Sequence, residues 1–99
     1  EFMHVDDLAQ ACLFLMDHYN GAEPINVGTG VDLSIRELAE TIVEVVGGRL
    51  RLEFDQSKPD GTPRKLLDSA RLSDLGWRAS IDLKTGLQST YRWYVNQVV

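Results

Sequence analysis

The amino-acid sequence predicts a small α/β fold that is rich in helices and has only short strands. Long stretches carry apolar residues at the three- and four-residue spacing of amphipathic helices. The stretches with strand-like apolar or alternating patterns are much shorter and lie at residues 2–5, 24–28 and 50–54. Because a few short strands cannot form a large sheet, the pattern favours a lobe of an enzyme over a complete doubly wound domain.

The first half of the chain alternates short strands with two helices. After the strand at 2–5, Asp6 or Asp7 is expected to cap a helix with an apolar face over residues 8–19, and the Asn-Gly pair that follows is expected to end it in the left-handed region. The strand at 24–28 leads into a glycine turn. Ser34 and Glu37 then form a capping box for a helix over residues 35–46, which a Gly-Gly pair ends.

The second half contains a strand, a turn-rich loop and two more helices. Leu50, Leu52 and Phe54 alternate with charged residues, as in a half-exposed strand. The loop covers residues 58–68, and a short helix follows it until Gly76. The last amphipathic helix covers residues 83–98.

Composition excludes several classes of protein. The formal net charge of -5 and the pI of about 4.8 argue against nucleic-acid and membrane-surface partners, which favour basic faces. The single cysteine, Cys12, excludes an internal disulfide and fits a reducing cytoplasm. No apolar run is long enough to cross a bilayer, and we see no leader peptide.

The loop at residues 58–68 is the main candidate site. It carries Lys58, Arg64 and Lys65 in an acidic chain, and its two prolines and one glycine suggest a defined shape. Arg and Lys are the side chains that bind phosphate, so the loop is a candidate anion site. Arg64 and Lys65 should point in opposite directions if the segment is extended. A solvated loop with surface charges is the open alternative.

Other chemistry-bearing residues favour structural roles. Gly28 and Gly30 lack the third glycine of a dinucleotide-binding fingerprint, because position 33 is leucine. Cys12 is expected to be a buried, inert thiol on the apolar helix face. His18 suits the negative end of its helix, and His4 is expected to bond a neighbouring carboxylate. We therefore predict no catalytic and no metal-binding residues.

Several segments resemble the extended short-chain dehydrogenase/reductases. Residues 2–9 are similar to the motif that opens their substrate-binding part, and residues 25–39 are similar to the next strand and helix. Residues 58–68 look like the corresponding segment of GDP-L-fucose synthases, whereas relatives that use UDP- or dTDP-sugars usually carry an Arg-Pro-Gly-Asp type of segment there. The resemblance continues through residues 75–77 and the last helix, and so covers essentially the whole chain.

The resemblance implies that residues 1–99 are the C-terminal substrate-binding lobe of a nucleotide-sugar epimerase/reductase. The N-terminal Rossmann domain, which binds NADP(H) in the family, is absent, and so is the family's Tyr-x-x-x-Lys pair. The lobe alone is therefore expected to bind no cofactor and to be inactive. The start of the chain, with no lead-in before residues 2–5, suggests a segment of a longer protein; a cloning scar before Met3 is the alternative.

By the same resemblance, Asp60 and Lys65 match GDP-sugar contacts, with Arg64 as a weaker candidate. Asp6 and Asp7 are interpreted as cap and loop-orienting residues. A parent homodimer, cytoplasmic location and self-association of the fragment are also expected. The alternatives are another nucleotide-sugar epimerase or dehydratase, a non-catalytic nucleotide-sugar-binding module, and a structural domain whose basic loop binds nothing.

Overall fold

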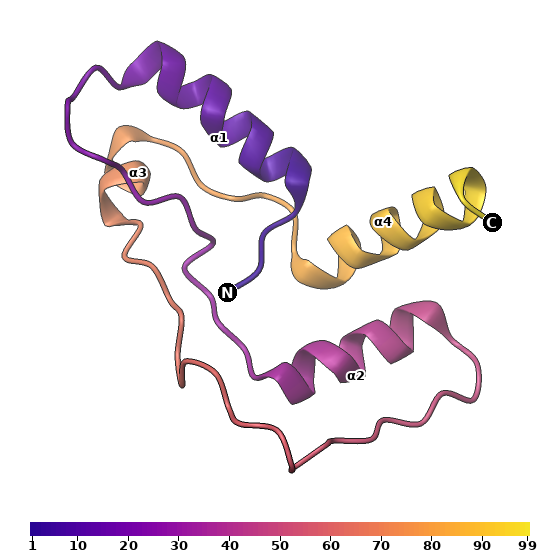
Figure 1. Cartoon of the computed structure of the whole chain (residues 1–99). Helices are drawn as coiled ribbons and strands as arrows, with labels where there is room; N and C mark the ends of the chain where they lie inside the picture. Colours follow the sequence, from indigo (N-terminus) through magenta and orange to yellow (C-terminus); the bar gives the residue numbers. More distant parts are fainter.

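The computed structural model describes residues 1–99 and contains four helices (Figure 1). They are α1 (Val5–His18), α2 (Ile35–Val46), α3 (Ala70–Leu75) and α4 (Leu83–Gln97). α2 and α4 lie side by side, whereas α1 and α3 occupy the other end of the molecule. The helix-rich lobe is therefore confirmed, with helix bounds close to those expected.

The start of α1 differs from the prediction. His4, and neither aspartate, is the N-cap residue, and its Nδ1 accepts a hydrogen bond of 3.2 Å from the Asp6 amide. Asp6 and Asp7 lie in the first turn, where negative charge suits the helix dipole. The first amides of a helix have no partner within the helix, and the His4 imidazole nitrogen accepts from one of them, the Asp6 amide, in the role expected of an aspartate carboxylate.

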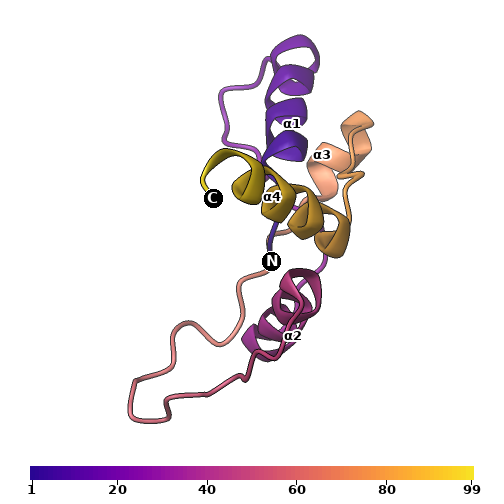
Figure 2. The same cartoon turned by 90° about the vertical axis from the view of Figure 1, so that its right-hand side faces the viewer.

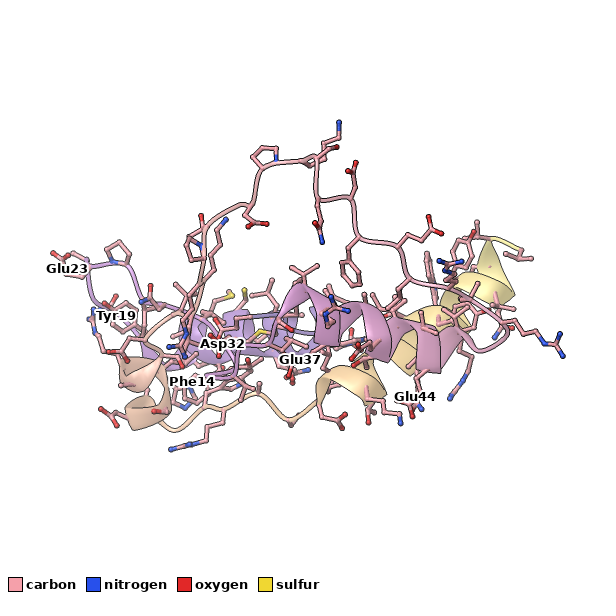
Figure 3. All side chains as sticks on the ribbon, turned by 90° about the horizontal axis from the view of Figure 1, so that it is seen from below. Phe14, Tyr19, Glu23, Asp32, Glu37 and Glu44 are labelled. Carbon is pink, nitrogen blue, oxygen red and sulfur yellow. The ribbon has the colours of Figure 1, made fainter.

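The end of α1 also differs from the prediction. The helix ends at His18, and Tyr19 takes an extended conformation with φ −131°. The Tyr19 hydroxyl donates a hydrogen bond of 2.7 Å to the Glu23 carbonyl across the turn, and Figure 3 shows the two residues together. Gly21 is needed for space, since a Cβ there would overlap the Tyr19 ring; its φ is not positive.

The other helix ends follow the sequence signals. The Glu37 amide donates to Ser34 Oγ at 3.1 Å, while the Ser34 amide donates to the Glu37 carboxylate at 2.7 Å, which confirms the capping box. Gly47 and Gly76 end α2 and α3 with φ values of 76° and 111°, which glycine adopts without strain. At the start of α4, the Asp82 carboxylate accepts from the Thr85 amide at 3.0 Å, a cap that was not predicted from the sequence.

The predicted strands do not form. No residue is in a β-ladder, and the backbone hydrogen bonds outside the helices join only residues close in sequence. A strand is stable only when a neighbouring strand satisfies its amides and carbonyls. Residues 2–4, 24–28 and 50–54 find no such neighbour in this chain.

The chain has almost no core of its own. Only five of the 99 residues are buried, and the buried apolar side chains are Ala11 on α1 and Leu72 on α3. The radius of gyration is 16.4 Å, whereas a compact domain of this length has about 13 Å. The molecule is a thin slab of 49 × 35 × 18 Å, so apolar side chains face solvent on several elements (Figures 1 and 2). None of its helices is long and apolar enough to cross a membrane.

Candidate functional site

The candidate loop is part of the long connection between α2 and α3. In Figure 2 this connection extends away from the helices, and Figure 3 shows it arching over them. Every residue from 58 to 68 is exposed. Gly61 does not adopt a positive φ, so the glycine freedom expected there is not used.

An ion pair anchors the C-terminal half of the loop. Arg64 Nε donates to Asp32 Oδ2 at 2.5 Å, and Arg64 Nη2 donates to Oδ1 at 3.4 Å. The hydrogen bond from Arg64 lowers the pKa of Asp32 below its ordinary value, and Asp32 in turn raises the pKa of Arg64. This contact ties the loop to the segment that precedes α2.

A second set of contacts holds the end of the loop beside the first residues of the chain. The Glu1 carboxylate accepts from the Gly30 amide at 2.8 Å and from the Leu67 amide at 3.4 Å. The Glu1 backbone nitrogen donates to the Lys65 carbonyl at 3.2 Å, and Asn26 Nδ2 donates to the Asp68 carbonyl at 3.1 Å. Residues 64–68 are therefore held in place by side-chain contacts, whereas the loop tip is not.

Two local contacts shape the approach to the loop. Asp55 accepts from the Ser57 amide at 2.9 Å and from the Ser57 hydroxyl at 2.6 Å, closing a turn just before the loop. Both hydrogen bonds lower the pKa of Asp55. The Arg36 guanidinium lies 4.2 Å from the centre of the Phe54 ring, which places the start of the connection against α2.

The three predicted contact residues are not gathered in one pocket. Asp60 and Lys65 are exposed, and their side chains make no hydrogen bond or ion pair. Arg64 is turned toward Asp32, and the expectation that Lys65 points the opposite way stays a prediction. The free side chains are therefore Asp60 at the tip and Lys65 at the anchored end.

Asp7 is the most buried charged side chain and orients the segment before α4. Its exposure is 3%, and its carboxylate accepts from the Ser80 amide at 3.1 Å, the Ser80 hydroxyl at 3.2 Å and the Ile81 amide at 2.9 Å. Burial alone would raise the pKa of Asp7, but these hydrogen bonds together lower it. The loop-orienting interpretation of Asp7 is confirmed by this geometry.

The remaining titratable candidates lie apart from the loop. His18 Nδ1 lies 2.9 Å from the Phe14 carbonyl, and the two rings stack with centroids 4.1 Å apart. Cys12 is exposed, so the prediction of a buried thiol is wrong. The reason is geometric: α1 turns Asp7 and Ala11 toward the chain, and the face that carries Cys12 meets no other element.

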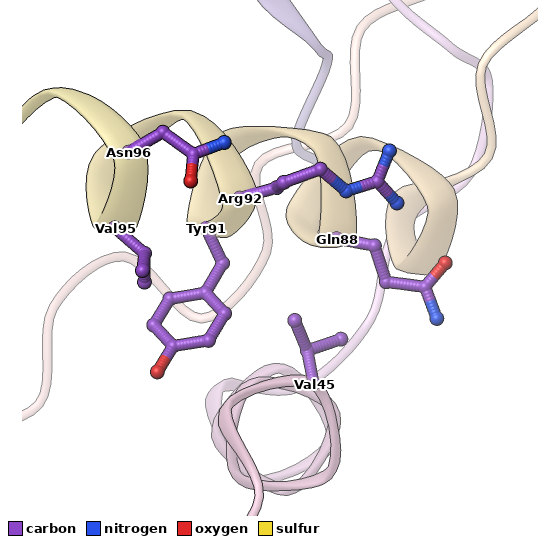
Figure 4. A pocket seen from close by; sticks show the side chains of 6 residues that line it. All are labelled: Val45, Gln88, Tyr91, Arg92, Val95 and Asn96. Carbon is purple, nitrogen blue, oxygen red and sulfur yellow. The ribbon is translucent and has the colours of Figure 1, made fainter.

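A groove between α2 and α4 is lined by no residues that form a catalytic or metal-binding set. It encloses about 440 Å³, and Tyr91 and Val95 project from α4 toward Val45 on α2 (Figure 4). The other lining residues are Gln88, Arg92 and Asn96. It holds no carboxylate, histidine or thiol, and it lies far along the helices from the anchored end of the loop. We interpret it as a gap in helix packing.

No protein-family model matches the chain. Individual relatives do. A putative GDP-L-fucose synthase 2 of Arabidopsis thaliana is 60% identical over 99 residues, which is 100% of this chain and 30% of the relative. The GDP-L-fucose synthase of Escherichia coli strain K12 is 54% identical, covering 96% of this chain and 32% of that enzyme. The chain is homologous to the C-terminal part of GDP-L-fucose synthases.

Solved structures agree with this relationship to the GDP-L-fucose synthases. A GDP-6-OMe-4-keto-L-xylo-heptose reductase from Campylobacter jejuni superposes with a TM-score of 0.89 at 36% identity, over 98% of this chain and 31% of that one. A GDP-mannoheptose C4 reductase from the same organism, solved with NADP bound, gives 0.83 at 36% identity, over 96% and 31%. The chain thus spans slightly under a third of the length of its GDP-L-fucose synthase relatives.

Sequence reasoning missed the residues that anchor the loop. Asp32 and Asn26 contact the loop from more than 30 residues away, and no local spacing signals such contacts. The glycines of the turn at residues 28–30 were the one sequence signal of a close contact. Gly28 leaves room for the Glu1 carboxylate, with which a Cβ at that position would collide.

Proposed function

We propose that this chain is the substrate-binding lobe of an enzyme that converts GDP-4-keto-6-deoxy-D-mannose to GDP-L-fucose with NADPH. The observation that supports it most is the identity of 54–60% to GDP-L-fucose synthases along essentially the whole chain. Such identity over a full lobe favours a shared ligand more than a shared fold alone.

In this proposal the loop at 58–68 holds the nucleotide. The Asp60 carboxylate accepts hydrogen bonds from hydroxyls of the nucleotide, and the Lys65 ammonium offsets the negative charge of the diphosphate or the ribose side. Arg64 acts mainly through Asp32, keeping Lys65 at the fixed end of the loop. The exposed tip leaves Asp60 free to move toward a bound nucleotide.

The lobe contributes binding and orientation, which can supply a large part of a catalytic barrier. NADP(H), held by the domain that the family carries elsewhere in the polypeptide, supplies the hydride. The residues of this chain fit that division because they include no Tyr-x-x-x-Lys pair and no nucleophile paired with a base. Residues 1–99 alone are therefore expected to show no NADPH oxidation with the keto-sugar.

The test uses a chimera: the E. coli GDP-L-fucose synthase with its matching C-terminal region replaced by residues 1–99. The chimera should convert the GDP-keto-sugar, and Lys65→Ala or Asp60→Ala should raise KM on the order of 10-fold, the effect of one charge-assisted hydrogen bond. Lys58→Ala, on the same loop but outside the proposed contacts, is the matched control and should change KM about twofold or less. Equal effects of Lys58→Ala and Lys65→Ala would contradict the assignment.

A second candidate is reduction of a different GDP-sugar, favoured by the superposition on the two heptose reductases. Offering the chimera a GDP-4-keto-heptose beside the 6-deoxy sugar, and comparing kcat/KM, separates the two.

We also propose that the parent enzyme is a cytoplasmic homodimer. Sedimentation of the chimera tests the dimer, which a monomer at all concentrations would exclude.

A further inference from the structure

The Glu1 carboxylate joins two segments that lie far apart in the sequence. Its Oε2 accepts from the Gly30 amide at 2.8 Å and from the Thr29 hydroxyl at 3.5 Å, whereas its Oε1 accepts from the Leu67 amide at 3.4 Å. One oxygen therefore holds the turn at residues 28–30, and the other holds the fixed end of the loop.

Gly28 provides the space for this carboxylate. Gly28 is buried, and a Cβ at this position would lie 2.6 Å from Oε1 and 2.8 Å from Oε2 of Glu1. Its φ is not positive, so the backbone conformation does not require glycine here. The need for glycine at residue 28 is therefore explained by the room that the Glu1 side chain occupies.

The Glu1 side chain does not act as a partner for a cation. Every side-chain ion pair of the chain joins other residues, and the three partners of the Glu1 carboxylate are neutral N–H and O–H groups. A carboxylate can accept from several directions at once. Because Glu1 accepts from two segments, it restrains the distance between them.

The contacts of Glu1 with the loop surround Lys65. The Glu1 backbone nitrogen donates to the Lys65 carbonyl, and the Glu1 side chain accepts from the Leu67 amide. Residues two apart in an extended segment direct their backbone groups to the same side, so both contacts hold one edge of the loop. The backbone of Lys65 is thereby fixed, whereas its ammonium makes no hydrogen bond or ion pair.

We propose that Glu1 is a positioning residue for Lys65 in the binding of a nucleoside diphosphate. This inference rests on the proposed function. A lysine side chain is long and flexible, so the volume that its ammonium samples depends on how firmly its backbone is held. Glu1 acts on that backbone and not on the ligand, by tying the loop to the turn at residues 28–30.

Glu1→Gln separates this role from a simple effect of charge. Glutamine keeps one acceptor oxygen and replaces the other by an NH2 donor, so it can hold the turn or the loop but not both. Removing a negative charge near a bound anion would by itself strengthen binding. Weaker binding of GDP by Glu1→Gln therefore has the sign that positioning predicts and that charge alone does not.

The test measures the dissociation constant of GDP by calorimetry in four forms of the chimera: unchanged, Glu1→Gln, Lys65→Ala and the double variant. Glu1→Gln should raise Kd about 3- to 10-fold, the effect of losing one hydrogen bond. In the Lys65→Ala background the same change should alter Kd about twofold or less, because Glu1 acts through Lys65. Glu23→Gln is the matched control, since that carboxylate lies in an exposed turn without a hydrogen bond or ion pair, and it should leave Kd unchanged.

Two results would overturn the proposal. One is a Kd that Glu1→Gln leaves unchanged or lowers. The other is an equal rise in Kd with and without Lys65, which would make Glu1 a general structural residue. If Glu1→Gln prevents folding, Gly28→Ala takes its place in the same four-protein comparison, because its Cβ displaces the carboxylate while Glu1 itself is kept.

A measurement without nucleotide tests the contact itself. Hydrogen exchange followed by mass spectrometry on the peptide that contains Leu67 should be faster in the Glu1→Gln chimera than in the unchanged chimera, and Glu23→Gln should have no effect. Exchange that Glu1→Gln does not change would also overturn the proposal. Faster exchange in a chimera that binds no GDP would contradict the proposed function and leave the anchoring by Glu1 in place.

Discussion

At the scale of single residues, Asp7 is expected to be the charged side chain that matters most for stability. Replacing it by alanine leaves the Ser80 and Ile81 amides without their buried acceptor, at a cost of about 1–3 kcal/mol in unfolding free energy. Urea unfolding followed by tryptophan fluorescence measures this. Asp6→Ala, an exposed neighbour in the same turn, is the control, and equal losses for the two variants would contradict the account.

The same carboxylate predicts a pH dependence. Since the folded-state pKa of Asp7 lies below its ordinary value of 3.8, its contribution to stability is present at neutral pH. It is lost as the pH falls from about 4 through the folded-state pKa. The difference in unfolding free energy between the wild type and Asp7→Ala should therefore shrink in acid, and a difference that grows in acid would contradict this.

The Arg64–Asp32 ion pair gives a second residue-scale prediction. In Arg64→Ala the pKa of Asp32 should rise toward its ordinary value, because the hydrogen bond from Arg64 is the main cause of its lowering. Carbon-13 NMR titration of the Asp32 carboxyl group measures it. Lys65→Ala, one position along, should leave that pKa unchanged; a change there with none in Arg64→Ala would place the contact elsewhere.

Residue roles could be predicted where the signal is local and not where the partner is distant. The Ser34–Glu37 capping box lies within four residues and is confirmed. Arg64 was recognisable as a cation in a shaped loop, but its partner Asp32 was not, because the contact depends on how the chain folds back. The prediction that Cys12 is buried was wrong for a related reason. The spacing of residues in a helix shows that one face is apolar, but it does not show what covers that face.

At the scale of elements, residues 50–54 are the clearest incomplete structure. Leu50 and Phe54 are 53% and 43% exposed, and the backbone between them has no hydrogen-bonded neighbour. We expect the amides of this segment to exchange with deuterium rapidly in the isolated chain and to become protected in the chimera, once a strand is available. The amides of Asp60, Gly61 and Thr62 at the loop tip serve as the control and should exchange fast in both. Fast exchange of 50–54 in the chimera would contradict this.

Helices and strands differed in predictability for a physical reason. A helix satisfies its backbone hydrogen bonds within the segment, so α2 could be placed from its capping box and spacing, and α4 from spacing alone. A strand depends on a neighbour that need not be close in sequence, and the alternation at 50–54 predicts only the capacity to pair. Strands are therefore absent because no neighbouring segment of this chain pairs with the strand-like segments.

At the scale of the whole molecule, the thin slab predicts self-association. Few buried residues and many exposed apolar side chains favour contacts between copies when nothing else covers them. Sedimentation of residues 1–99 should show dimers or larger species at high concentration, because many apolar side chains are exposed. A chain that remains monomeric at millimolar concentration would exclude this.

We propose that this lobe positions a guanosine diphosphate sugar through the loop at residues 58–68. The most direct measurement is inhibition of the chimera by GDP and by UDP, each with and without Lys65→Ala. The account predicts that GDP inhibits at a concentration at least ~10-fold lower than UDP, and that Lys65→Ala weakens inhibition by GDP. Equal inhibition by the two nucleotides, or inhibition by GDP that Lys65→Ala leaves unchanged, would contradict it.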